Sequence, residues 1–338
     1  MARCRTWLWT GIAIAVIGVA VSAALLRERS RQYHGPADEI RIGIPSAYYS
    51  LLFLVAEENG YFERNGLKIT PDTYEKDYTS VEKLTLGKVD FAVASEYAFA
   101  WASLQEGTEN LRIVASTATV MAQELVARRD RGIQSPADLN GKRIGVLKDS
   151  PADFSLDRFL TLQNLPPEKV TKVSLSYEDC ATAIAKGDID ATVLFGIPLF
   201  NAEKALAANA VTWPTNVAQP HYWLLIAKEE TIEAKAAATR RLLKALLEAQ
   251  EFTAAHLDDA KSLLARRWDF DPDFIRQARD TAKFDVSLEQ AMIAAMEDET
   301  DWLAERYPAG KRAPVNFFRL IHLDALDAVR PEAISIFR

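Results

Sequence analysis

Cysteine and histidine are scarce in this chain, and the few that occur form no recognisable site. The 338 residues include two cysteines, Cys4 and Cys180, and four histidines. Because Cys4 precedes an apolar N-terminal segment, Cys180 is the only thiol expected in the folded part, and no disulfide can form there. The histidines show neither HExxH nor CxxC spacing, which excludes the common zinc motifs. The sequence therefore predicts no metal site and no cofactor.

The sequence also lacks a catalytic constellation and a basic surface. There is no nucleophile elbow, and the scattered histidines leave no group of residues that could carry a reaction. The formal net charge of −7 argues against nucleic acid as the main partner. With 49% hydrophobic and 26% charged residues, the chain can bury a large core without disulfides. We therefore expect a globular protein that is not an enzyme and has no catalytic residues.

One long apolar run lies near the N-terminus. Within residues 1–26, the basic residues Arg3 and Arg5 come first, and residues 7–26 follow as an uncharged run. About 20 apolar residues can span a bilayer, which favours an uncleaved anchor in the inner membrane. The small residues 21–23 favour a cleaved signal peptide instead. Both interpretations place the rest of the chain outside the cytoplasm, in the periplasm or its equivalent.

After a polar linker at residues 27–38, strand and helix patterns alternate. Residues 39–69 read as strand, turn, helix, turn and strand, with Ile40 and Ile42 on alternate positions of the first strand. Such a unit presents a helix N-terminus and its N–H groups at one edge of a sheet, where a ligand can bind. An ordinary connection without a ligand has the same pattern. The alternation predicts an α/β fold.

A second copy of this pattern begins about a hundred residues later. The segment LTLGKVDFAV at residues 84–93 and the segment IAKGDIDATV at residues 184–193 share Gly, Asp and Val at the same places. The strands around Ile42 and Ile144 repeat at nearly the same offset. Two sequence repeats at nearly the same offset indicate two lobes of similar build.

The chain after Ile226 is rich in helical patterns and would return to the first lobe. Lobe 1 would then comprise residues 39–127 and 223–338, including a helical C-terminal tail, and lobe 2 would comprise residues 128–222. Two segments would cross between the lobes and form a hinge.

Four pieces of sequence, in order, carry a resemblance to a known family. They are Gly43-Ile44 with Leu54–Phe62 and Gly66-Leu67, then Leu86–Ala92, then Gly132–Val146, then Ala183–Pro198. This set resembles the substrate-binding proteins of ABC importers, in the group for nitrate, taurine, aliphatic sulfonates and thiamine precursors (NMT1/THI5-like). The resemblance implies a type II periplasmic-binding fold. In this fold, two α/β lobes, each a mixed and mostly parallel sheet flanked by helices, close over a ligand, and a helical tail follows.

The resemblance also implies a function and its partners. It implies a monomer that captures a small-molecule solute and delivers it to the membrane permease of an ABC importer. A membrane-tethered sensor or scaffold domain with the same fold is the alternative, favoured by the apolar run at residues 7–26. Relatives that make the thiamine pyrimidine carry a cysteine-rich stretch, which nothing in this sequence matches, so an enzyme of that type is the least favoured alternative.

Candidate binding residues lie in loops that follow predicted strands, since ligands of open α/β sheets bind beyond the carboxyl ends of the strands. Helix N-termini and hydroxyls in these loops could hold a polar group, and tyrosines could form flat walls. Glu96 would favour a ligand with N–H donors over a bare anion, which suggests an amphipathic or heterocyclic organic solute. Packing roles for the tyrosines, helix capping by Ser95 and Ser150, and a solvated Glu96 are the alternatives. The predicted ligand-binding residues are Ser46, Tyr48, Tyr49, Thr79, Ser80, Ser95, Glu96, Tyr97, Asp149, Ser150 and Phe195.

Overall fold

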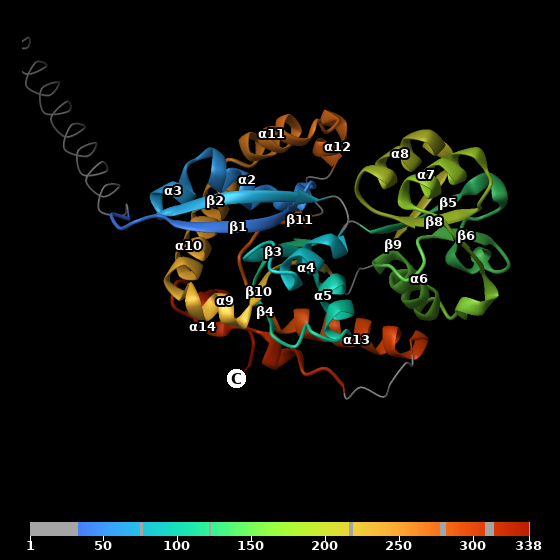
Figure 1. Cartoon of the computed structure of the whole chain (residues 1–338). Coiled ribbons are helices and arrows are strands. Elements are labelled where there is room, and N and C mark those ends of the chain that lie inside the picture. The colour runs from blue at the N-terminus through green and yellow to red at the C-terminus, as the bar shows by residue number, and fades with distance from the viewer. Residues whose placement is uncertain are drawn as a thin grey trace, which may run out of the picture.

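The protein folds into two lobes, each a sheet flanked by helices (Figure 1). The structure is a computed structural model that describes residues 33–74, 77–121, 123–215, 219–277, 282–307 and 314–337. The predicted signal peptide or anchor at residues 1–26 lies outside the described residues. Within those ranges, no helix combines the length and the apolar character needed to cross a membrane.

A six-stranded sheet forms the first lobe, with strand order β11-β4-β10-β3-β1-β2. β1 lies between β2 and β3 and is parallel to both, whereas β10, β4 and β11 are joined by antiparallel pairs. The strands are β1 (Asp38–Pro45), β2 (Leu67–Tyr74), β3 (Phe91–Ser95), β4 (Leu111–Val120), β10 (His221–Lys228) and β11 (Ala282–Lys283). All five residues of β3 are buried, because helices cover both faces at the centre of the sheet.

The second lobe repeats this arrangement in a five-stranded sheet of order β7-β6-β8-β5-β9. β6 lies between β7 and β8 and is parallel to both, and β5 pairs antiparallel with β8 and with β9. The strands are β5 (Glu124–Arg128), β6 (Arg143–Val146), β7 (Thr171–Ser174), β8 (Ala191–Leu194) and β9 (Ala210–Pro214). The two mixed sheets confirm the expected architecture, with the parallel part limited to three strands in each lobe.

The chain crosses between the lobes from β4 to β5 and again from β9 to β10. The boundary predicted at residue 128 left β5 in lobe 1, but the backbone hydrogen bonds of β5 join it to β8 and β9 in the second sheet. The first crossing therefore lies before Glu124. The predicted return at residue 223 lies just inside β10, which belongs to the first sheet.

The repeated sequence motif corresponds to a repeated hydrogen-bonding unit. In the first lobe, the Asp90 carboxylate accepts a bond from the backbone N–H of Arg41 at 2.8 Å. In the second lobe, the Asp190 carboxylate accepts the equivalent bond from Arg143 at 2.9 Å. The N–H of each aspartate donates in turn to the carbonyl of the same arginine, at 2.8 Å in both lobes. The nearly equal offsets seen in the sequence thus reflect the same junction between a helix and two parallel strands.

Helices of the first lobe follow the predicted pattern, with one shifted start. They are η1 (Tyr48–Ser50), α2 (Leu51–Glu58), α3 (Tyr61–Arg64), α4 (Asp77–Thr85) and α5 (Glu96–Ser103). A capping pattern at residues 79–82 suggested a start at Thr79. α4 already begins at Asp77, so Thr79 and Ser80 lie inside its first turns.

Helices of the second lobe cover both faces of its sheet. They are η2 (Arg129–Arg131), η3 (Pro136–Leu139), α6 (Pro151–Leu162), η4 (Pro167–Lys169), α7 (Tyr177–Lys186), α8 (Gly196–Leu206) and η5 (Ala207–Asn209). Cys180 of α7 is fully buried in a cluster with Ile184 and Ile189, and this burial raises the pKa of its thiol. It is therefore a core residue.

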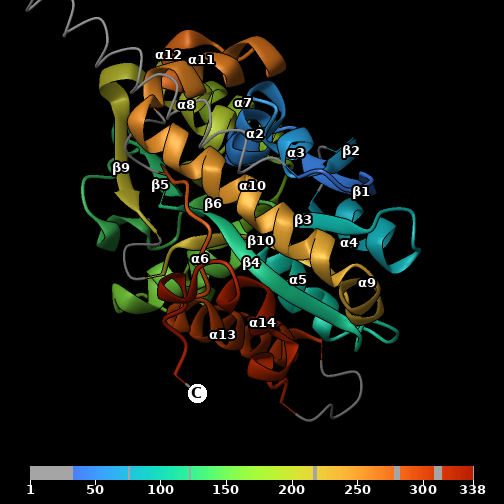
Figure 2. The same cartoon turned by 90° about the vertical axis from the view of Figure 1, so that its left-hand side faces the viewer.

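The C-terminal tail is helical and packs mainly on the first lobe, with α10 lying diagonally across that lobe (Figure 2). Its helices are α9 (Glu229–Ala234), α10 (Ala236–Ala255), α11 (Leu257–Trp268), α12 (Pro272–Gln277), α13 (Gln290–Arg306), η7 (Phe317–Leu320), α14 (Leu323–Asp327) and η8 (Pro331–Ala333). Two of them also reach the second lobe. α12 contacts α8, and α13 is joined to α6 by ion pairs.

Candidate functional site

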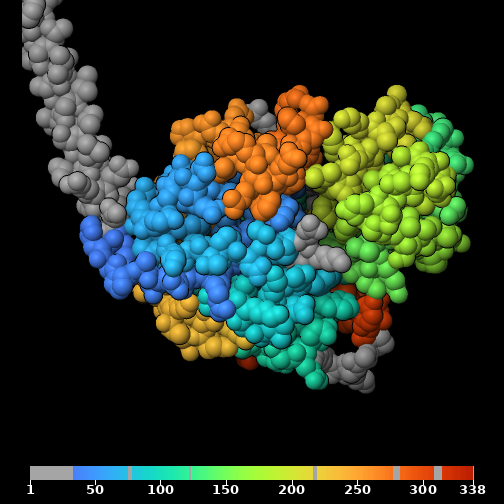
Figure 3. Space-filling view, turned by 45° about the horizontal axis from the view of Figure 1, so that its top comes forward, coloured from blue at the N-terminus to red at the C-terminus, as the bar shows by residue number. Residues whose placement is uncertain are grey.

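A groove of about 630 Å³ lies between the two lobes. The first lobe contributes the turn Ser46–Tyr49, which follows β1, and the tail contributes Phe270 and Phe274 at α12. The second lobe contributes the exposed side of α7 and the first turns of α8. Figure 3 shows the α11–α12 segment, in orange, beside the yellow-green second lobe. The groove is thus built from segments far apart in the chain, and its walls belong to both lobes.

Aromatic rings hold the first-lobe wall in place. Tyr48 is 6% exposed and its ring meets the edge of Phe274, with ring centroids 6.2 Å apart. Burial raises the pKa of the Tyr48 hydroxyl, which therefore stays neutral. The Tyr49 ring stacks on Trp223 of β10, with centroids 3.4 Å apart and planes 11° apart. These contacts fix a flat, mostly apolar surface for a ligand.

The second-lobe wall carries the start of a helix. Phe195 occupies the N-cap of α8 in an extended conformation, and its side chain makes no capping hydrogen bond. The N–H groups of Gly196 and Ile197 therefore open α8 at the groove, where the helix dipole favours a negative group. Lys186 and Glu178, at the two ends of α7, are charged groups on the same wall. The groove combines apolar walls with one end suited to an acidic group.

The structure divides the predicted binding residues into two sets. Ser46, Tyr48, Tyr49 and Phe195 line the groove. Ligand contact by these four stays a prediction. The remaining seven do not line this groove and are Thr79, Ser80, Ser95, Glu96, Tyr97, Asp149 and Ser150.

Both serine caps predicted from the sequence are confirmed. The Ser95 hydroxyl accepts a hydrogen bond from the N–H of Ala98 at 3.1 Å and caps α5. The Ser150 hydroxyl accepts one from the N–H of Asp153 at 3.3 Å and caps α6. Ser80 is fully buried. Ser95 and Ser150 thus serve the local fold of the two lobes, and ligand contact by the three serines stays a prediction.

Tyr97 is a packing residue in the described geometry. Its ring is fully buried beside Phe154 of α6 and Leu303 of α13. Burial raises the pKa of its hydroxyl. Asp149 borders a smaller cavity of about 370 Å³ between the second lobe and the end of α13, and its carboxylate accepts a hydrogen bond from the Tyr307 hydroxyl. Tyr97 therefore packs α5 of the first lobe against α6 and α13, and Asp149 joins the second lobe to the end of α13.

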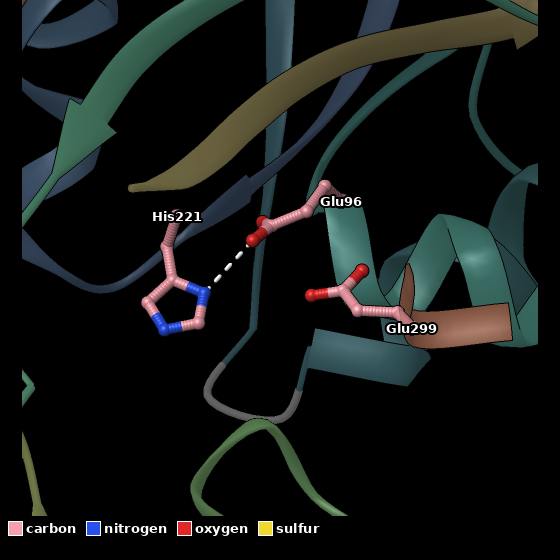
Figure 4. Close-up of side chains that lie close together, drawn as sticks. All are labelled: Glu96, His221 and Glu299. Carbon is pink, nitrogen blue, oxygen red and sulfur yellow. Dashed lines mark hydrogen bonds and ion pairs between the residues drawn. The ribbon is translucent and has the colours of Figure 1, made fainter. Parts of the chain in front are cut away.

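Glu96 begins α5 but does not line the groove, and its carboxylate points toward His221 (Figure 4). It is 1% exposed, and one carboxylate oxygen lies 2.8 Å from Nδ1 of His221. The other oxygen accepts a hydrogen bond from the N–H of Tyr222 at 2.9 Å. The carboxylate is therefore engaged inside the first lobe. The argument that Glu96 disfavours an anionic ligand does not apply to the groove.

Several groove residues were not predicted from the sequence. Thr182 and Lys186 lie on the exposed side of α7, one helical turn apart, and Asn201 lies on α8. Phe270 lies just before α12 and Phe274 on it, with ring centroids 5.6 Å apart. They occur in the tail, for which the sequence suggested only packing. The helical spacing of Thr182 and Lys186 was the available signal.

Comparison with known proteins gives one family and one fold. The family model described as "NMT1/THI5 like" matches residues 48–260, more than half of the chain. A Bacillus subtilis protein named for aliphatic sulfonate binding is 25% identical over 279 residues, which cover 80% of this chain and 82% of that protein.

Solved structures share the same fold at lower identity. The alkanesulfonate-binding protein SsuA of Xanthomonas axonopodis pv. citri, bound to MOPS, superposes with a TM-score of 0.68 at 19% identity, covering 86% of this chain and 99% of that chain. The desulfurization enzyme DszB superposes with a TM-score of 0.63 at 16% identity, covering 88% of this chain and 99% of that chain. At such identities the likeness shows the fold alone, which serves both a binding protein and an enzyme.

Proposed function

Because the chain belongs to the NMT1/THI5-like family, we propose that it is an extracytoplasmic solute-binding protein that delivers a small organic solute to an ABC importer. The observation that carries this proposal is the groove of about 630 Å³ with walls from both lobes. Its volume is within the range of about 300 to 1,000 Å³ usual for small-molecule sites. A solute that contacts both walls binds the closed arrangement more tightly than an open one, and so favours closure.

We propose further that the solute is an organic anion with an apolar body, of the alkanesulfonate class. The N–H groups that open α8 at Gly196 and the ammonium of Lys186 suit an acidic head group with several acceptor oxygens. Tyr48 and Phe274 suit an aliphatic or cyclic body. The name of the Bacillus subtilis relative supports the same class.

A panel of solutes tests this proposal through the protein's own fluorescence. Trp223 lies directly beneath Tyr49 of the groove wall, so a bound solute should change its emission. Hexanesulfonate should raise the melting temperature and change the emission with saturation, because a ligand of the native state stabilises it. Nitrate, which lacks the apolar body, and hexylamine, which lacks the acidic group, serve as controls. Equal responses to all three compounds, or no response to any sulfonate, would overturn the proposed solute class.

Uptake separates delivery from sensing. If the protein delivers its solute, deleting it should abolish growth on the bound compound as sole sulfur source, and the intact protein should restore growth. If instead the protein binds the solute normally but its deletion leaves uptake of the solute unchanged, the tethered sensor is favoured. The apolar run at residues 7–26 is the feature that supports this alternative.

A further inference from the structure

Two glutamates and a histidine converge beside the point where the chain returns to the first lobe. Glu96 begins α5, His221 begins β10 and Glu299 lies on α13 (Figure 4). One candidate ligand atom from each lies within 4.8 Å of the other two. Both glutamates are 1% exposed, whereas the His221 side chain is 16% exposed. None of the three lines the groove, so this cluster is separate from the proposed solute site.

Gln123 sets the orientation of the imidazole. Its amide oxygen lies 3.4 Å from Nε2 of His221 and also accepts a hydrogen bond from the Thr215 hydroxyl at 3.3 Å. Gln123 is 1% exposed, and among the described residues its amide nitrogen has no hydrogen-bond partner. Nε2 of the ring faces this amide, and Nδ1, the other ring nitrogen, faces Glu96.

Nδ1 of His221 lies 2.8 Å from a carboxylate oxygen of Glu96. A proton shared by the two atoms, or a cation bound by both, would hold them at this distance. Buried carboxylates in proteins are either paired or bind a metal. A proton would satisfy His221 and Glu96 alone. The carboxylate of Glu299 points toward the same place from α13, so a metal ion there could take one ligand atom from each of the three side chains.

We propose that the cation is a divalent transition metal of the Zn²⁺ type, bound by Glu96, His221 and Glu299. One imidazole nitrogen and two carboxylate oxygens form a ligand set that such metals accept. The contact of Gln123 with Nε2 is the outer hydrogen bond that usually orients a metal-binding histidine. The N–H of Tyr222 holds the second oxygen of Glu96 in the same way. The ligands come from distant parts of the sequence, so no motif spacing could have shown the site.

The place of the cluster indicates what the metal would do. Gln123 lies next to the first crossing and His221 begins the strand after the second. α13 also carries Asp298, whose carboxylate pairs with Arg158 of the second lobe at 2.5 Å. A bound metal would therefore tie the tail to the crossing segments, and we expect it to stabilise the protein whether or not solute is present.

Titration of the untagged, metal-free protein with Zn²⁺ by calorimetry tests this proposal. We expect saturable binding of one ion and a higher melting temperature in the absence of any solute. Glu299→Gln keeps the size of the side chain and the contact between Glu96 and His221. It should weaken binding by at least about tenfold, since loss of even an outer partner typically costs 10- to 100-fold. His256→Gln removes an exposed imidazole at the end of α10 and should change nothing.

A second variant and a spectroscopic readout keep the test decisive. Gln123→Leu leaves all three ligands in place and should weaken Zn²⁺ binding by about 10- to 100-fold, even if Glu299→Gln fails to fold. Co²⁺ in place of Zn²⁺ should give a visible absorption band that either variant reduces. The absence of saturable binding, or equal binding by the wild type and both variants, would show a proton-only network or adventitious surface binding and would overturn the proposal.

Discussion

At the scale of single residues, burial separates groups that can meet a solute from groups that serve the fold. Tyr48 and Glu96 both follow a strand of the first sheet, and sequence reasoning treated them alike. Tyr48 lies on the wall of the groove. Glu96 binds His221, 125 residues away along the chain. No local pattern reveals a partner at that distance, so the helix start at Glu96 could be predicted and its role could not.

Lys186 provides a residue-scale test of the solute's charge. Lys186→Met removes the ammonium but keeps much of the side chain. We expect it to weaken hexanesulfonate binding by about 3- to 10-fold, because two charges a few ångströms apart near water interact by about 1 kcal/mol or somewhat more. Lys204→Met is the control, because Lys204 is exposed on the same lobe outside the groove lining. Equal affinities of the two variants, measured by calorimetry, would argue against an anionic head group near Lys186.

Asp90 provides a residue-scale test by pH. Burial raises the pKa of its carboxyl, but hydrogen bonds from the Arg41 N–H and the Lys235 ammonium outweigh burial and hold the pKa below the ordinary 3.8. Because the pKa in the folded state is below the ordinary pKa, the ionised carboxylate stabilises the fold at any pH above the ordinary pKa. This contribution is lost as the pH falls through the lowered pKa. Asp90→Asn should therefore lower the free energy of unfolding by about 1 to 2 kcal/mol at pH 7.

The difference between wild type and Asp90→Asn should shrink in urea titrations carried out below the ordinary pKa of 3.8. Asp188→Asn, at an exposed turn, should change stability by less than about 0.5 kcal/mol at either pH. A difference between wild type and Asp90→Asn that is the same at neutral and acidic pH would contradict this account of the carboxylate.

At the scale of secondary-structure elements, repeated local chemistry was predictable and strand pairing was not. The motif around Asp90 recurs around Asp190 because both aspartates bond the backbone of the neighbouring strand. This made two similar lobes visible in the sequence. β5 was assigned to the wrong lobe because its apolar pattern fits either sheet. Only its pairing with β8 and β9, which lie far along the chain, shows that β5 belongs to the second lobe.

The two lobes also differ at equivalent glycines, Gly43 of β1 and Gly145 of β6. A Cβ atom added at Gly145 would lie 2.5 Å from Ile189 and 3.1 Å from Cys180, whereas one at Gly43 would have its nearest contact at 3.6 Å. Gly145→Ala should therefore cost about 1 kcal/mol or more through overpacking, relieved in part by rotation of Ile189. Gly43→Ala should stay within about 0.5 kcal/mol of wild type. Chemical denaturation would measure both, and equal costs would show that the two strands are packed alike.

At the scale of the whole molecule, α13 fastens the tail of the first lobe to the second. Asp157 of α6 is 6% exposed and accepts a hydrogen bond from Nε1 of Trp302 at 3.1 Å. It also pairs with Arg306 and with Lys172. The two lobes are thus joined by two crossing segments and by this contact. The sequence predicted that the tail would pack on the first lobe, but the bridge to α6 depends on tertiary contacts alone.

Asp157→Ala tests this bridge. Its removal leaves the partly buried Arg306 guanidinium and the Trp302 indole N–H without this acceptor and should cost about 2 kcal/mol or more. Asp298→Asn is the matched control, because Asp298 pairs with Arg158 across the same interface but is 53% exposed. Exposed pairs are worth at most about 1 kcal/mol. If urea unfolding shows the control to be as destabilised as Asp157→Ala, the buried carboxylate is not the main connection.

A groove-filling substitution tests whether the groove between the lobes holds the proposed organic anion. Ala185 is an exposed residue of α7 on the groove wall, and Ala237 is an exposed alanine of α10 outside it. Calorimetric titration with hexanesulfonate should show one binding site in the wild type and in Ala237→Trp, and none in Ala185→Trp, whose indole would occupy the space. Unchanged binding by a folded Ala185→Trp would place the solute elsewhere and contradict the account.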